Sequence, residues 1–258
     1  MKKLLNIPLL PENKVSGVFI SGEYPEINQA LKDKYGITSV IVNQNRNLAP
    51  EISSHADCMM VQMNKNSFII ESGNSDHFVN YLTKIKGELN SDFNVIQSRE
   101  KIQSPYPGDV CLNVKVMGNS VIGNKKYISS DILEFCNNHN MRIIHTNQGY
   151  SACSTIILND NALITDDESI FTSSGINGID CILISKGSVK LKGHNYGFIG
   201  GTCGMINKNL IAFTGKLSTH TDSDIIINFL DKHNIDFVEL TDGPLIDIGG
   251  IIPITEEC

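Results

Sequence analysis

The sequence predicts an α/β protein: a five-bladed ββαβ propeller with pseudo-fivefold symmetry, its ring closed by the N- and C-terminal segments. Three observations predict this fold class. Four segments align on Cys58, Cys111, Cys153 and Cys203, which lie 53, 42 and 50 positions apart. Each segment continues as two apolar stretches around a polar turn, then a helical stretch and a further apolar stretch. The two termini supply the pieces of a fifth unit, so we expect a single domain over residues 1–258.

The repeated polar turn has an asparagine at a nearly constant place. This residue follows the cysteine by eight positions in the first three units and by six in the fourth, as Asn66, Asn119, Asn161 and Asn209. Apolar stretches flank each turn, and their second members are residues 67–70, 120–122, 162–164 and 210–213. A strand, an Asn/Gly turn and a second strand are typical of a β-hairpin.

Helices are expected after three of these hairpins, over residues 75–89, 129–140 and 219–234. Ser75 is a candidate N-cap of the first helix, and Thr221 or Asp222 of the last. Each helix leads to an apolar strand, at residues 93–98, 141–146 and 235–241. The third unit is the least regular, because residues 167–178 predict only a weak helix and residues 181–193 predict an added hairpin.

The fifth unit is divided between the ends of the chain. Residues 244–255 lack the cysteine but have the place of a first strand. Residues 13–21, 26–36 and 37–42 supply a second strand, a helix and a last strand. A closed ring requires such a division because its ends must meet. The repeat is too long and too helical for the four-stranded blade of an ordinary propeller.

Composition and charge exclude several classes of function. The net charge of −7 and the pI near 5.5 argue against a nucleic-acid partner, which would require a basic surface. No stretch reaches the 18 apolar residues of a membrane span, and the N-terminal apolar run is broken by Pro8 without a cleavage site, so we expect a cytoplasmic protein with no membrane partner. Seven cysteines without a CxxC motif indicate free thiols.

The repeat pattern resembles the pentein fold of the guanidine-modifying enzymes, which include arginine deiminases, amidinotransferases and dimethylarginine hydrolases. Residues 55–61 are similar to the strand with which the first dimethylarginine-hydrolase unit enters its site, and Gly108-Asp109-Val110 to the second unit's Gly-Asp-Val. Residues 201–208 and 159–166 are more similar to initiation factor six, a non-catalytic ribosome anti-association factor of the same fold. The sequence as a whole resembles an uncharacterised bacterial branch of this superfamily.

The resemblance implies a specific set of catalytic residues. Enzymes of this fold use a Cys nucleophile from the last unit, a His acid/base from the third, and carboxylates from the first two that bind the guanidinium. Asp57 and Asp109 match the carboxylates, but Gln62 stands where a further acid is expected. Asp247 stands near the nucleophile's place, and no His directly precedes Cys153. We therefore expect the standard Cys/His pair to be absent.

The expected function is binding of a small cationic or amino-acid-like ligand in an axial pocket. Its predicted rim is Asp57, Gln62, Asp109, Ser151, Thr202 and Asp247, whose convergent carboxylates favour a cation. One alternative is a non-catalytic protein-binding module like initiation factor six, with a protein partner. A second is a divergent amidinohydrolase or deiminase, for which Cys153, Cys203 and His194 are the catalytic candidates.

The cysteines themselves are first interpreted as architecture. A small buried residue at one register of four units is expected where strands converge, with Cys153 in apolar surroundings behind the pocket. His55 and Asp57, with Asp109 or Asp247, are possible metal ligands, but no His pair at i,i+4 supports them, so no metal is expected. No GxGxxG motif opens a helix, so no cofactor is expected either.

Overall fold

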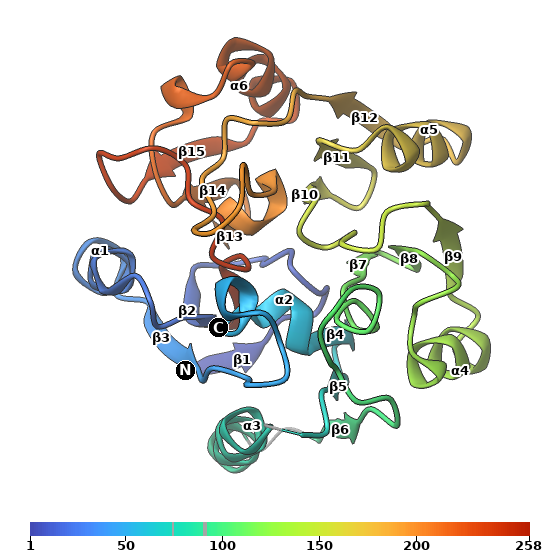
Figure 1. The fold of residues 1–258 in the computed structure, drawn as a ribbon. Helices are drawn as coiled ribbons and strands as arrows, with labels where there is room; N and C mark the ends of the chain where they lie inside the picture. The colour runs from blue at the N-terminus through green and yellow to red at the C-terminus, as the bar shows by residue number, and fades with distance from the viewer. Residues whose placement is uncertain (74, 90–91) are drawn as a thin grey trace.

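The computed structural model describes residues 1–73, 75–89 and 92–258, and the strands of these residues form five small sheets (Figure 1). Four of the sheets share one plan: an antiparallel pair, then a helix, then a third strand parallel to the second. The hairpins at the predicted turns are therefore confirmed. The sheets remain separate, and no single closed sheet runs through the described ranges.

The bounds of the four units follow the predicted order. The first has β4 (Met60–Asn64), β5 (Ser67–Ile70), α3 (Asp76–Leu89) and β6 (Asn94–Gln97). The second has β7 (Lys115–Met117), β8 (Ser120–Gly123), α4 (Ser130–Asn138) and β9 (Arg142–His145). The third has β10 (Thr155–Asn159), β11 (Ala162–Thr165), α5 (Glu168–Ile176) and β12 (Asp180–Leu183). The fourth has β13 (Cys203–Asn207), β14 (Leu210–Phe213), α6 (Ser223–Lys232) and β15 (Asp236–Glu239).

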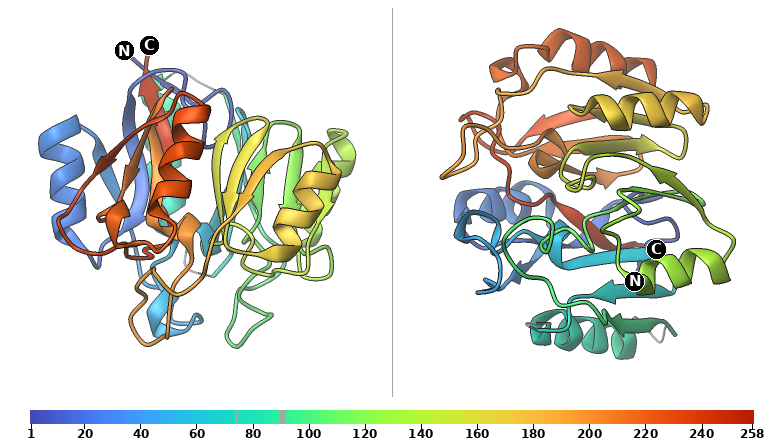
Figure 2. Two further views of the ribbon diagram at one scale, coloured as in Figure 1. Left: turned by 90° about the horizontal axis from the view of Figure 1, so that it is seen from above. Right: turned by 45° about the vertical axis from the view of Figure 1, so that its right-hand side comes forward.

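The fifth sheet joins the two ends of the chain, as the divided unit predicts. Its strand order is β1 (Lys2–Leu4), β16 (Ile252–Glu257), β2 (Val15–Ser21) and β3 (Thr38–Val42), with α1 (Pro25–Tyr35) between β2 and β3. The C-terminal strand β16 lies antiparallel to both β1 and β2. The two termini lie side by side (Figure 2), and the backbone N–H of Cys258 donates to the carbonyl of Met1 at 3.0 Å.

Helices α1, α3, α4, α5 and α6 lie at the periphery in Figure 1, and the first strands of the units lie toward the middle. Strand β4 contacts β7, β7 contacts β10, β10 contacts β13, and β13 contacts β16. The second strands β5, β8 and β11 are buried along their whole length, and β14 is buried except at Leu210, because each lies between its helix and the neighbouring strands. In α3, Phe78, Leu82 and Ile85 give the buried face at helical spacing.

In three of the turns a local role belongs to the asparagine two residues before the recurring one. The side-chain oxygens of Asn64 and Asn159 accept the backbone N–H two residues on, both at 2.8 Å, and Asn207 accepts from Lys208. The strand register shifts beside each of these residues. Such Asx contacts stabilise a tight turn. The second unit uses Gly118 instead, with a φ of 55°.

One sequence prediction about local structure is wrong, and another is confirmed only in part. Residues 181–193 do not form a hairpin: the first part is β12, and the N–H of Lys190 donates to Leu245 because Val189 and Leu191 are buried in the core. Asp222 occupies the N-cap position of α6 but makes no capping bond, since its carboxylate accepts the N–H of Ser185. Ser129, by contrast, caps α4 through the N–H of Ile132.

The remaining short elements precede the inner strands or lie in loops. They are η1 (Pro50–Ile52), α2 (Ala56–Met59), η2 (Ile199–Thr202) and η3 (Leu217–Thr219). Cys58 therefore lies in a helical turn before its strand, and Cys111 and Cys153 also precede theirs. Among the described helices, none has the length and apolar character needed to cross a membrane.

Candidate functional site

A cavity of about 320 Å³ lies where the turns before the inner strands meet the loop over residues 191–198. Its walls combine aromatic and aliphatic side chains with a few polar ones, as in many small-molecule sites. The lining residues that matter for its chemistry are His55, Tyr150, Cys153, His194, Phe198 and Asp247. They come from the first, third and fifth units and from the loop before η2.

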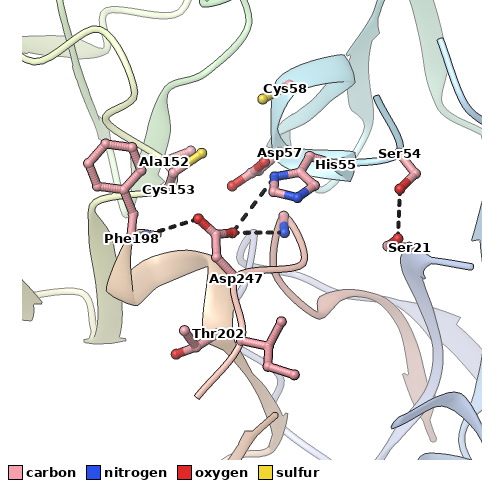
Figure 3. A network of polar contacts seen from close by, with 12 residues as sticks. Ser21, Ser54, His55, Asp57, Cys58, Ala152, Cys153, Phe198, Thr202 and Asp247 are labelled. Carbon is pink, nitrogen blue, oxygen red and sulfur yellow. Dashed lines mark hydrogen bonds and ion pairs between the residues drawn. The ribbon is translucent and has the colours of Figure 1, made fainter. Parts of the chain in front are cut away.

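Asp247 is held on the cavity wall by backbone donors. One of its carboxylate oxygens accepts the N–H of Phe198 at 2.9 Å, and the other accepts the N–H of Gly249 at 3.1 Å (Figure 3). Gly249 has a φ of 75°, and a Cβ there would lie 2.4 Å from the Cα of His55. Only glycine allows this turn to approach His55 so closely.

His55 and Asp247 form a buried pair. The Nδ1 of His55 lies 3.7 Å from Oδ1 of Asp247, and both side chains are almost fully buried. Burial raises the pKa of Asp247, while His55 and the backbone donors oppose that rise. The pair thus presents an imidazole and a carboxylate to one cavity that also holds a thiol.

Cys153 is buried in the main hydrophobic cluster, as predicted, but it lines the cavity rather than lying behind it, and its sulfur has a polar neighbour. The side-chain amide of Asn113 donates to the Sγ of Cys153 at 3.1 Å and to the Sγ of Cys58 at 3.4 Å. The oxygen of the same amide accepts the N–H groups of Ala152 and Cys153, which fixes the amide with its NH₂ toward the sulfurs. The sulfurs converge because the turns of three successive units meet at Asn113.

Burial keeps both thiols protonated near neutral pH. It raises the pKa of Cys153 well above its ordinary value, with a further contribution from Cys58. For Cys58 the contact with Cys153 lowers the pKa, but burial and Asp57 outweigh it and the net shift is upward. A buried thiol with a raised pKa is a poor nucleophile.

Asp109 reaches the cavity only through Tyr150. The hydroxyl of Tyr150 donates to Oδ2 of Asp109 at 2.6 Å, and burial, together with this bond, raises the pKa of the tyrosine. The ring of Tyr150 lies 5.8 Å from the ring of Phe198, at 32° to it. Together these two rings form an aromatic wall beside Cys153 and Asp247.

A second, narrower cavity of about 50 Å³ lies between the inner strands and takes up other predicted residues. Asp57, Gln62, Cys203 and Lys115 line it. Lys115 donates to the carbonyl of Ala152 at 3.1 Å, and burial lowers the pKa of its amine. Burial also raises the pKa of Cys203 to about 12.

The six residues predicted to rim one pocket therefore do not share a single cavity. Asp247 lines the larger cavity, and Asp57 lies beside it with its side chain toward Asp247 (Figure 3), while Gln62 faces only the narrow cavity. Ser151 and Thr202 line neither: their hydroxyls bond the carbonyls of Gln148 and Ile199. His194 lines the larger cavity with Cys153, whereas Cys203 lines the narrow one, and no hydrogen bond between His194 and Cys203 occurs among the described residues.

Several residues of the site carried no sequence signal. Asn113, Tyr150 and Phe198 lie in no motif, and their roles depend on how turns from different units meet. His55 had one signal, its place directly before Ala56-Asp57-Cys58, which matches the family strand. The unit pattern predicted that Asp57 and Asp247 lie at one end of the inner strands, but it did not predict how completely they are buried.

One family model matches residues 19–252, and it describes a family of unknown function, DUF6873. The chain belongs to this family. No curated protein matches the sequence.

Solved structures match this DUF6873 chain over nearly its whole length. The agmatine deiminase of C. jejuni is 10% identical with a TM-score of 0.54, and the match covers 93% of this chain and 90% of that one. A cysteine-to-serine form of that enzyme with substrate bound is 11% identical with a TM-score of 0.56, and the match covers 93% of this chain and 91% of that one. The DDAH of Pseudomonas aeruginosa, complexed with citrulline, is 8% identical with a TM-score of 0.51, and the match covers 89% of this chain and 92% of that one. The protein has the pentein fold, as its repeats predicted; at these identities the likeness concerns the fold alone.

Proposed function

We propose that the protein binds a small cationic or amino-acid-like ligand in the cavity lined by His55, Cys153 and Asp247. The observation that carries the proposal is the buried carboxylate of Asp247 on the cavity wall, with Asp57 beside it. No lysine or arginine is among the described residues that line this cavity. A bound cation would lower the electrostatic cost of the two buried acids.

The shape of the cavity supports the same class of ligand. Its volume of about 320 Å³ suits a molecule the size of an amino acid. The aromatic wall of Tyr150 and Phe198 can face a planar or quaternary cation, and a desolvated contact of that kind contributes about 2 kcal/mol. We also propose that the five units form a closed pseudo-fivefold propeller. The contact of α2 with β2 supports this, because it joins the first unit to the fifth.

The test is a thermal-shift titration with agmatine, L-arginine and putrescine as cations and with urea as a neutral control. At 100 times its Kd a ligand stabilises the native state by about 2.7 kcal/mol, a readily measured shift in Tm. Asp247→Asn should abolish the shift, and Phe198→Leu should weaken it while keeping the backbone donor to Asp247. Asp166→Asn removes a buried acid outside the cavity and should leave the shift intact. No shift with any cation, or an equal shift in all variants, would contradict the proposal.

A second candidate function is amidine hydrolysis with Cys153 as nucleophile. One observation favours it: Cys153, His55 and His194 line the same cavity. Release of ammonia from agmatine or arginine by the wild type, and its loss in Cys153→Ser, would support this candidate. The raised pKa of Cys153 counts against it. No specific observation among the described residues favours the protein-binding alternative.

A further inference from the structure

Three side chains of metal-ligand type converge beside the cavity. A carboxylate oxygen of Asp57 and the sulfurs of Cys58 and Cys153 all lie within 4.8 Å of one another. All three side chains are buried, at 6%, 0% and 2% exposure. The helical turn α2 supplies Asp57 and Cys58 as neighbours, and the turn before β10 supplies Cys153.

The carboxylate of Asp57 is the unusual member. Neither of its oxygens has a hydrogen-bond partner within the ranges that the structure describes. A buried carboxylate without partners is costly, and such groups are ordinarily paired or bound to a metal. No ion pair to Asp57 occurs among the described residues, and Lys115, which shares its cavity, donates to Ala152.

The sulfurs are oriented by a donor outside the cluster. The Asn113 amide directs its NH₂ to both sulfurs, and its oxygen is held by two backbone N–H groups. A donor aimed at two sulfurs stabilises them as electron-rich acceptors, which is the role that outer hydrogen bonds have around metal ligands.

We infer that Asp57, Cys58 and Cys153 form a binding site for a thiophilic divalent metal ion of the zinc type, which displaces the two thiol protons into solution as it binds. Two sulfurs disfavour Mg²⁺ and Ca²⁺, which prefer oxygen ligands, and a carboxylate disfavours Cu⁺. With Zn–S bonds of about 2.3 Å, tetrahedral coordination requires the ligand atoms to approach by roughly 1 Å. Three protein ligands leave a fourth position for another ligand, and one of the three, Cys153, lines the larger cavity.

This inference does not rest on the proposed function, but the two are compatible. The carboxylate of an amino-acid-like ligand could occupy the fourth metal position while its ammonium faces Asp247. A Cys153 that ligates a metal is not a free nucleophile, so the inference excludes amidine hydrolysis by Cys153.

The test uses Co²⁺ as a spectroscopic probe, added to the reduced, metal-free full chain under anaerobic conditions. We expect a thiolate-to-cobalt charge-transfer band that saturates at one ion per chain and is bleached by Zn²⁺. Cys58→Ser, Cys153→Ser and Asp57→Asn should weaken Co²⁺ binding at least roughly tenfold, as losses at metal sites generally do. Cys111→Ser removes a buried cysteine at the same register of the second unit and should bind Co²⁺ like the wild type.

The opposite results are equally clear. A reduced wild type with no charge-transfer band, or a band unchanged in the three variants, would overturn the inference. If a serine variant fails to fold, Asp57→Asn decides, because it keeps both thiols and the size of the side chain. Asp247→Asn should lose the amine-induced thermal shift yet keep the cobalt band, so the failure of one proposal is distinguishable from the failure of the other.

Discussion

Burial sets the chemistry of the individual titratable residues in this protein. Asp247 and Asp166 are both enclosed, and both accept N–H groups from the backbone around η2. For each, burial raises the pKa more than these donors lower it. Both acids therefore destabilise the fold when ionised, and of the two only Asp247 lines the larger cavity, where a bound cation would offset that cost.

The first prediction concerns Asp166, whose pKa burial raises from 3.8 to about 7. Between these values the unfolded chain has lost the proton and the native state retains it, so stability falls as pH rises from about 4 to 7. Asp166→Asn removes this dependence. Its free energy of unfolding should rise relative to the wild type across that range, by up to roughly 4 kcal/mol.

Urea unfolding at several pH values measures this difference. Asp160→Asn, in an exposed turn, is the control and should follow the wild type across the range. A constant difference between Asp166→Asn and the wild type from pH 4 to pH 8 would show that Asp166 titrates normally in the native state.

At the scale of elements, the sequence predicted those helices and turns that are determined by residues close together in the chain. The helix over 75–89 followed from apolar residues at helical spacing, and the turns at Asn64 and Asn159 from side chains that bond their own backbone. Residues 181–193 were mispredicted because alternating apolar residues fit a hairpin as well as a loop that buries Val189 and Leu191.

The site was predicted less well than the elements, for a physical reason. Asp57 and Asp247 could be placed near each other because each has a fixed position within its unit, but Asp109 reaches the cavity only through Tyr150. The contact of Cys58 with Cys153 could not be predicted, because it depends on how three units pack around Asn113. No spacing within one unit encodes that contact.

The second prediction tests the packing of neighbouring elements. A Cβ at Gly204 in β13 would lie 1.9 Å from the carbonyl oxygen of Ile251, at the start of the segment that enters β16. Because backbone cannot yield as a flexible side chain does, Gly204→Ala should destabilise by about 1–3 kcal/mol or more. Gly87→Ala in α3 meets nothing within 4 Å and should stabilise by about 0.5–1 kcal/mol.

Chemical denaturation of the two variants gives both values. Equal effects of the two substitutions would mean that β13 and the segment before β16 are farther apart than the structure has them. The comparison is matched because each variant adds a single methyl group to a glycine in a regular element.

At the scale of the whole molecule, the two ends of the chain are fastened to each other. Strand β16 lies between β1 and β2, so the last residues complete a sheet that the first residues begin. The buried carboxylate of Glu256 accepts the N–H groups of Glu12 and Asn13, both at 2.7 Å, and lies 3.3 Å from Lys3. This arrangement holds the fifth unit together although its strands are far apart in sequence.

The third prediction follows from these adjacent ends. A circular permutant that joins Cys258 to Met1 through a short Gly/Ser linker, and opens between the exposed Lys186 and Gly187, should fold and melt within a few degrees of the wild type. The linker replaces an existing contact between the ends, and the new ends lie in a loop outside every sheet. A second permutant with the same linker, opened between Ile254 and Thr255, divides buried strand β16 and should lose most of its stability. Circular dichroism melting curves compare the two. If the permutant opened at Gly187 also failed to fold, or if the one opened in β16 melted like the wild type, the pairing of β16 with β1 and β2 would not be what holds the fifth unit together.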